Sequence, residues 1–232
     1  ETAENGTFRP LADHGLTVRY CSNFAHGACN WMIDASSPNE LCRACQLNRT
    51  IPDLSVAENL RRWQRIEVAK HRLVYSLLRL GLPVESKVEA PERGIAFDFL
   101  APPEGEDGQG KILTGHDRGD ITLNVAEADD AVRAKVREAM GEPYRTLLGH
   151  FRHEIGHYYF ERLVKNTKNY EVFRKTFGDE TQDYAKALQA YYANGAPADW
   201  GTHYISAYAS SHPHEDWAET FAHYLHMVDT LE

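Results

Sequence analysis

Apolar side chains recur at helical spacing between residues 55 and 80. They lie three, four or seven positions apart and therefore share one face of a helix. Ser55 and Glu58 have the spacing of a capping box, and Gly81 and Pro83 end the pattern. The sequence predicts a long amphipathic helix that packs one face on a core. The apolar positions are Leu60, Trp63, Ile66, Leu73, Leu77 and Leu80.

The pattern changes between residues 94 and 126. Residues 95–100 alternate as a strand does, and 111–114 and 121–125 are short runs of the same kind. The turn sequence Asp-Arg-Gly-Asp at 117–120 precedes the last of them. We expect these runs to form a small antiparallel or mixed sheet.

The rest of the chain has helical periodicity. Pro143 suits the first turn of a helix that continues past residue 157 to about Val164, and Gly195 stops a later helix. The fold class predicted from these elements is α+β, mostly helical with a small sheet. Helices are expected near 128–139, 143–164, 169–177, 180–194 and 213–228.

Residues 1–53 differ from the remainder because they are rich in turns and contain every cysteine, and so short a segment cannot bury much apolar surface alone. The spacing of Cys21, Cys29, Cys42 and Cys45 is C-x7-C-x12-C-x2-C. A C-x2-C pair lets two thiolates from one turn reach one metal ion, so we favour a structural zinc site over disulfides or free thiols. His26 could replace one cysteine. We therefore divide the chain into a zinc-ribbon-like segment, 1–53, and a main domain, 54–232.

The net charge of −9 argues against a protein that binds nucleic acid over its whole surface. Residues 42–80 do carry an excess of arginine and lysine. We interpret them as a solvated helix face, and nucleic-acid binding through the ribbon and this helix is the alternative. No apolar run is long enough to span a bilayer, and no secretory signal is visible. We expect a cytoplasmic protein with no membrane partner.

The candidate chemistry lies in the expected helix at 143–164. Its stretch His153-Glu154-Ile155-Gly156-His157 has the form H-E-x-x-H. Histidines four residues apart project from one helical face, so both imidazoles can bind one zinc ion. Glu154 is placed to contact a metal-bound water without binding the metal itself. The alternative is an aromatic helix that is rich in histidine by coincidence.

A catalytic zinc site needs a third protein ligand. The extended motif that would supply it locally is absent, since Phe160 and Leu163 occupy its glycine and histidine positions. The segment 208–219 is the candidate source. Glu215 and Glu219 share one face of its helix, so that one can bind the metal and the other can accept a hydrogen bond from a ligand histidine. His212 and His214 are competing ligands.

H-E-x-x-H followed by E-x-x-A-E on a later helix resembles the gluzincin metallopeptidases. Tyr208, seven residues before Glu215, is similar to the lethal-factor type of these enzymes. More broadly, the chain resembles bacterial "putative zinc-binding metallopeptidases" with an N-terminal zinc ribbon. The stretches that carry this resemblance are 41–45, 50–54, 149–159 and 215–220.

The resemblance implies a zincin fold and peptidase-type chemistry. Zinc would be bound by His153, His157 and Glu215, with Glu154 as the general base that activates a zinc-bound water. Glu219 would support a ligand histidine, and Tyr208 would donate to the oxyanion. The implied cofactors are one catalytic and one structural Zn²⁺.

The implied substrate is a peptide or protein, and zincins pair it with an edge strand of their sheet, for which we choose residues 121–125. The competing hypothesis is a non-catalytic scaffold held together by zinc.

Several other aromatic residues and histidines are expected to have structural roles. We assign His150 and His116 to packing or surface positions, although His116 could line a cleft. His223 and His226 are expected next to the ligands or in the core. Tyr158, Tyr159 and Phe160 are expected to pack in the core.

Overall fold

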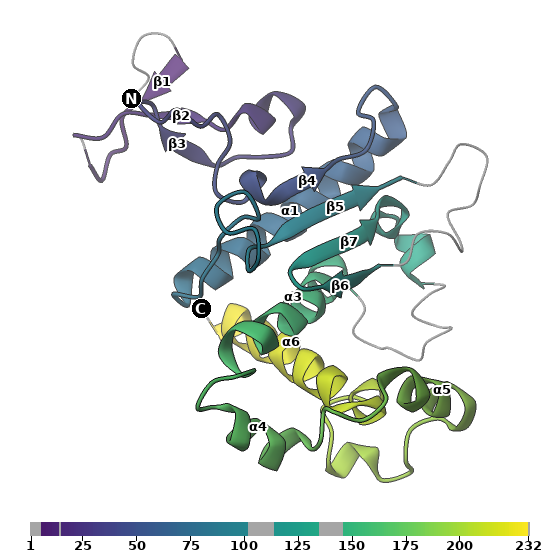
Figure 1. The fold of residues 1–232 in the computed structure, drawn as a ribbon. Helices are drawn as coiled ribbons and strands as arrows, with labels where there is room; N and C mark the ends of the chain where they lie inside the picture. The colour runs from purple at the N-terminus through teal and green to yellow at the C-terminus, as the bar shows by residue number, and fades with distance from the viewer. Residues whose placement is uncertain (1–5, 14, 102–113, 135–145, 232) are drawn as a thin grey trace. The chain divides into compact units, whose positions relative to one another are not determined.

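The computed structural model describes residues 6–13, 15–101, 114–134 and 146–231 (Figure 1). The chain divides into two compact units. The first comprises Glu1–Leu113 with Leu123–Ala128, and the second comprises Thr114–Thr122 with Asp129–Glu232. Helices and small sheets occur together, which confirms the predicted α+β class. The boundary expected after residue 53 lies inside the first unit and stays a prediction.

The first unit begins with a small antiparallel sheet in the order β1-β2-β3. Its strands are only two or three residues long: β1 (Thr7–Phe8), β2 (Val18–Tyr20) and β3 (Met32–Asp34). Val18 pairs with Asp34, and Tyr20 pairs with Met32. Short 3-10 helices at Ser22–His26 and Cys45–Leu47 complete this segment. So little regular structure buries little apolar surface, and such segments commonly depend on a metal or disulfides for stability.

The long helix expected near residues 55–80 is confirmed as α1 (Ala57–Arg79). Trp63, Ile66 and Leu73 on its apolar face are completely buried. The predicted capping box is wrong, because the hydroxyl of Ser55 donates to Oδ1 of Asp53 at 2.7 Å. The backbone N–H of Ser55 donates to the same oxygen at 2.9 Å. This local turn takes the hydroxyl away from the helix end, and no side chain caps α1.

The larger sheet of the first unit has the strand order β4-β5-β7. Strand β4 (Asn48–Thr50) runs parallel to β5 (Ala96–Leu100), which is buried over its first four residues. Asp98 of β5 is buried. Its carboxylate accepts hydrogen bonds from Arg49 Nε at 3.0 Å and Thr50 Oγ1 at 2.7 Å, which compensate the cost of burying it. The strands expected at 95–100 and 121–125 are confirmed to within one residue. Of the strand expected at 111–114, residues 111–113 lie outside the described residues.

Where it is described, the second unit contains a hairpin and several helices, and four of the α-helices are described over their whole length. Strand β6 (Gly115–Asp117) pairs antiparallel with β7 (Asp120–Asn124), and the turn between them has positive φ at Arg118 and Gly119. Strand β7 crosses the boundary between the units, since Leu123 and Asn124 belong to the first. The helices are α3 (Leu147–Leu163), α4 (Tyr170–Phe177), α5 (Tyr184–Asn194) and α6 (Pro213–Leu231).

The remaining helix predictions are borne out where the residues are described. Helix α5 is shorter than expected, because it begins at Tyr184, with Asp183 as its N-cap. The helix expected at 128–139 begins at residue 130 and is described as far as 134, and Pro143 lies outside the described residues. Within the described part of the chain, no helix combines the length and the apolar character needed to cross a bilayer.

Helices α3 and α6 lie side by side in the second unit (Figure 1). Gly156 permits this approach, because a Cβ atom at that position would lie 3.1 Å from the Cα of Ala218. The indole N–H of Trp217 on α6 donates to the carbonyl oxygen of Gly156 at 2.8 Å. Tyr158, Tyr159 and Phe160 of α3 are buried, as expected. The close contact fixes the acidic start of α6 opposite the histidines of α3.

The expectation that residues 121–125 form an edge strand is wrong. Strand β7 lies between β5 and β6 in the strand order, and β6 is the last strand. The sequence shows that a strand is present, but the pairing order depends on contacts that are distant along the chain.

Candidate metal centres

Helix α3 holds the two motif histidines one turn apart. It begins after Thr146, whose hydroxyl accepts the N–H of Gly149 at 2.9 Å. The Nε2 atoms of His153 and His157 lie 3.2 Å from each other, and the ring centroids are 4.9 Å apart. Both rings therefore direct the same nitrogen to one point.

Glu215 on the first turn of α6 faces the same point. Its Oε2 lies 3.1 Å from Nε2 of His153, and its Oε1 lies 3.5 Å from Nε2 of His157. The side chain is 1% exposed, and Oε2 has no hydrogen bond of acceptable geometry. A buried carboxylate is costly unless a nearby positive charge compensates it.

These separations suit a tetrahedral zinc ion. Nitrogen and oxygen ligands lie about 2.0–2.1 Å from zinc, so two ligands of a tetrahedral ion are about 3.3 Å apart. The two Nε2 atoms are 3.2 Å apart, and they lie 3.1 and 3.5 Å from Glu215, each from a different oxygen of its carboxylate. Two imidazoles and a carboxylate are also the donor set of catalytic zinc sites that keep a position open. The residues present therefore fit the ion that the sequence motif implies.

Glu219 orients one of the two histidines. Its Oε1 lies 2.7 Å from Nδ1 of His153, and its Oε2 accepts the hydroxyl proton of Ser206 at 2.7 Å. Burial opposes charge on His153, but the carboxylates of Glu215 and Glu219 raise its pKa well above the usual value. A bound cation would displace the proton from Nε2 and leave the proton on Nδ1. Glu219 thus contacts the ligand histidine and not the ligand position itself.

Glu154 lies in the same buried surroundings. Burial raises its pKa, but the hydrogen bond from His150 Nε2, at 3.1 Å, and the charges of nearby histidines lower it to about 2. The carboxylate is therefore ionised at neutral pH. His150 was expected only to pack or to face solvent, and the structure adds this contact with Glu154.

The three candidate ligands and Glu154 line a cavity of about 410 Å³ within the second unit. Residues 114–118, in and next to β6, line another part of the cavity wall. His116 is among them. The alternative that His116 lines a cleft is therefore confirmed, in place of the packing or surface position expected for it. Tyr184, Tyr208 and His214 also line the cavity.

The competing third ligands, His212 and His214, make other contacts in the same unit. Nε2 of His212 is 3.3 Å from the carbonyl oxygen of Gln182, and the ring of His214 packs on Phe160 with centroids 4.6 Å apart. His223 Nδ1 is 2.8 Å from the carbonyl oxygen of Glu219, and His226 Nδ1 is 3.3 Å from Arg152. Among the described residues, the group with converging ligand atoms here is His153, His157 and Glu215.

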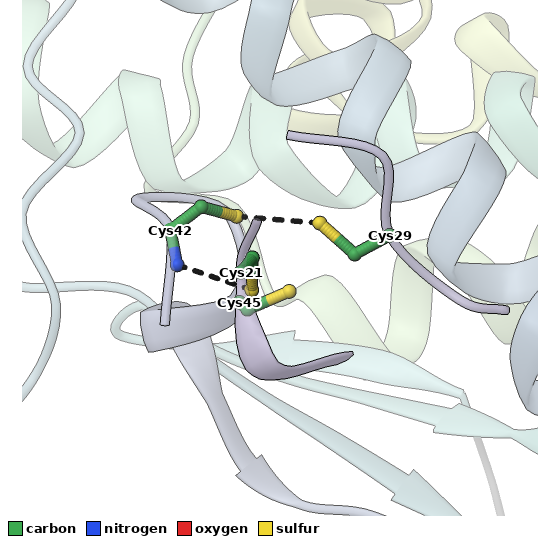
Figure 2. A group of neighbouring side chains, drawn as sticks. All are labelled: Cys21, Cys29, Cys42 and Cys45. Carbon is green, nitrogen blue, oxygen red and sulfur yellow. Dashed lines mark hydrogen bonds between the residues drawn. The ribbon is translucent and has the colours of Figure 1, made fainter. Parts of the chain in front are cut away.

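The four cysteines form a second cluster, in the first unit (Figure 2). All four are buried and free, so the disulfide alternative is wrong for this structure. Sγ of Cys29 lies 3.7 Å from Sγ of Cys42, and the backbone N–H of Cys42 donates to Sγ of Cys21 at 3.3 Å. Sulfur ligands about 2.3 Å from a tetrahedral zinc ion are about 3.8 Å apart. The cluster therefore fits a structural zinc ion.

Two families match the chain. Residues 59–232 match the family described as "Putative zinc-binding metallo-peptidase", and residues 1–56 match a zinc-ribbon domain. The chain belongs to this metallo-peptidase family. Both matches support zinc binding, and they coincide with the two clusters of ligand atoms.

Uncharacterized proteins of Mycobacterium bovis and of two Mycobacterium tuberculosis strains are similar to this member of the metallo-peptidase family. Each is 43% identical over 216 residues, which are 93% of this chain and 62% of the relative. The chain thus spans less than two thirds of these relatives. No solved structure matches it.

Tyr184 also belongs to the candidate metal centre and was not predicted from the sequence. Its hydroxyl donates to Oε1 of Glu215 at 2.7 Å from the start of α5. Burial, followed by the charge of Glu215, raises its pKa, so the hydroxyl keeps its proton. No local signal marks this residue, because its partner lies 31 positions away.

Replacing Glu219 with alanine is expected to weaken zinc binding at His153 and His157 by about 10–100-fold, as loss of such supporting carboxylates does. The reason is that His153 Nδ1 loses the acceptor that fixes the orientation of its ring. Competition with a fluorescent zinc chelator measures the change. Glu171→Ala, at an exposed position on α4, is the control. An unchanged dissociation constant for Glu219→Ala would show that Glu219 does not orient the ligand.

Proposed function

We propose that the chain is a zinc-dependent peptidase. The observation that carries the proposal is the meeting of His153, His157 and Glu215 beside the ionised Glu154 in one cavity. We further propose two zinc ions per chain. One would be catalytic at these three residues, and one would be structural at the four cysteines. Membership of a metallo-peptidase family supports both parts.

The roles of the side chains follow from their contacts. A zinc ion at this site would supply a Lewis acid, which polarises a carbonyl and lowers the pKa of water. Glu154 would accept the proton of the attacking water and return it to the leaving amine. His150 would hold the Glu154 carboxylate through its contact at 3.1 Å. Glu219 would keep His153 in the orientation that binding requires.

Tyr208 is the proposed donor to the oxyanion. It lines the cavity, and its ring centroid lies 6.0 Å from that of His153. Burial, followed by the charge of Glu215, raises its pKa far above the usual value. A hydroxyl that keeps its proton throughout the pH range of enzymes can donate a hydrogen bond to negative charge that develops on a substrate oxygen.

The proposed substrate is an extended peptide segment of a peptide or protein. Strand β6 pairs with β7 along one edge and is the last strand in the order of the described sheet. Residues 114–118 also line the cavity that contains Glu154. Main-chain hydrogen bonds to such an edge would hold a peptide bond near the site with little dependence on side chains. This role replaces the one expected for residues 121–125.

Digestion of a proteome-derived peptide library tests the proposal. We expect cleavage by the purified chain, its loss after treatment with a zinc chelator, and its return when zinc is added back. Mass spectrometry identifies the new peptide ends. The control is the same series with Glu171→Gln, at an exposed carboxylate outside the cavity. Zinc at both sites with no cleavage of any peptide would instead favour a non-catalytic scaffold.

A further inference from the structure

The two oxygens of the Glu215 carboxylate have different surroundings. Oε2 lies 3.1 Å from Nε2 of His153 and has no hydrogen bond of acceptable geometry from the described residues. Oε1 accepts a hydrogen bond from the hydroxyl of Tyr184 at 2.7 Å, and it also lies 3.5 Å from Nε2 of His157. Both oxygens are therefore near the point where the histidine nitrogens meet, and the hydroxyl of Tyr184 distinguishes them.

The segment that carries Tyr184 is held against the start of α6. The Tyr184 ring packs edge-on against the ring of His212, with centroids 5.1 Å apart and planes at 78°. Nδ1 of His212 accepts the backbone N–H of His214 at 3.1 Å, so the ring proton is on Nε2. That nitrogen lies 3.3 Å from the carbonyl oxygen of Gln182, two residues before Tyr184. The buried His212 thus joins the segment before α5 to the residue next to Glu215.

We propose that Tyr184 is a positioning residue that limits Glu215 to one bond with zinc, through Oε2. The inference rests on the catalytic zinc of the proposed function and deepens it. The hydroxyl engages Oε1 and fixes the plane of the carboxylate, as hydrogen bonds to metal-binding carboxylates do in general. Oε2 is then the oxygen left available for the ion.

A single bond from Glu215 decides how many positions of the ion remain open. Two imidazoles and one carboxylate oxygen supply three ligands and leave the fourth position of a tetrahedral zinc ion for water or substrate. If Oε1 also bound, the same residues would supply four ligands, and water or substrate would have to bind as a fifth. Tyr184 would thus keep open the position beside Glu154, which lines the same cavity.

Cobalt and zinc binding to the full chain test the inference. Tyr184→Phe removes the hydroxyl and keeps the ring that packs on His212, and the side chain is 43% exposed, so the variant is expected to fold. The cobalt spectrum is taken as a difference against Co²⁺-loaded Glu215→Ala, which removes the contribution of the cysteine site. We expect Tyr184→Phe to lose visible absorption in this difference spectrum, because the ion gains Oε1 as a fifth ligand.

Zinc affinity provides the second measurement. Competition with a fluorescent chelator, with the Glu215→Ala titration defining the cysteine site, is expected to show a dissociation constant about 10-fold higher in Tyr184→Phe. This is the lower end of the usual effect of such supporting groups. Tyr224→Phe, the same change at an exposed tyrosine on α6, is the control and should leave both measurements unchanged. Circular dichroism checks that each variant is folded.

Three results would overturn the inference. A cobalt difference spectrum of Tyr184→Phe identical to that of the wild type would mean that the hydroxyl does not set the number of ligand oxygens. An unchanged zinc dissociation constant would mean that it does not fix the carboxylate. A wild-type protein without any Glu215-dependent cobalt spectrum would remove the zinc site, and the inference with it. None of these results depends on peptide cleavage, so they are distinguishable from failure of the catalytic proposal.

Discussion

Glu154→Gln is expected to lower kcat for peptide hydrolysis by about 10²–10⁴-fold, the usual contribution of a general base, while both zinc ions remain bound. Glutamine keeps the shape of the side chain but cannot take a proton from water. The carboxylate is not one of the three converging ligand groups, so metal binding does not require it. Steady-state rates on one library-derived peptide, with zinc measured by elemental analysis, check both halves of the prediction.

The matched control for this variant is Glu171→Gln, which makes the same chemical change at an exposed site on α4. It is expected to retain the wild-type rate and zinc content. Undiminished turnover by Glu154→Gln would contradict the assigned base. Loss of the catalytic zinc in Glu154→Gln would instead mean that Glu154 belongs to the metal site.

Glu215→Ala is expected to reduce the zinc content from two ions to one per chain and to abolish hydrolysis. The substitution removes the candidate ligand on α6 and leaves two histidines, which bind zinc weakly without a third protein ligand. Elemental analysis of the purified variants measures the effect. Glu215→Gln keeps the side-chain volume, so it serves as a second variant if Glu215→Ala fails to fold.

Cys42→Ser provides the reciprocal comparison. It is expected to lose the other zinc ion and to keep the one at His153 and His157. The unfolding temperature of Cys42→Ser should fall further than that of Glu215→Ala, because structural zinc contributes directly to folding. Two zinc ions in Glu215→Ala would contradict the assignment and transfer the third ligand to another side chain.

The sequence predicted those parts of the site that depend on local periodicity. His153 and His157 are one turn apart on any regular helix, and the buried face of α1 follows from its apolar spacing. Gly156 also indicates a helix contact, since a residue without a side chain permits the close approach of a second helix. Glu215 was predicted from its motif and not from helix geometry, since its partner His153 lies on a different helix.

The contacts that were missed join distant parts of the chain. Tyr184 reaches Glu215 because of where α5 begins, and His212 reaches the carbonyl oxygen of Gln182 across 30 positions of sequence. Neither contact produces a periodic pattern in the sequence from which it could be predicted. The capping box failed for a different reason, because Asp53 competes locally for the hydroxyl of Ser55.

His153, His157 and Glu215 are proposed to bind one zinc ion beside Glu154. Anomalous diffraction from crystals of the purified chain, measured on both sides of the zinc absorption edge, locates the ion. We expect an anomalous peak within about 2.0–2.2 Å of His153 Nε2, His157 Nε2 and a Glu215 carboxylate oxygen, and a second peak among the four cysteine sulfurs. If the first peak is absent, or lies on a different set of side chains, this zinc site is wrong.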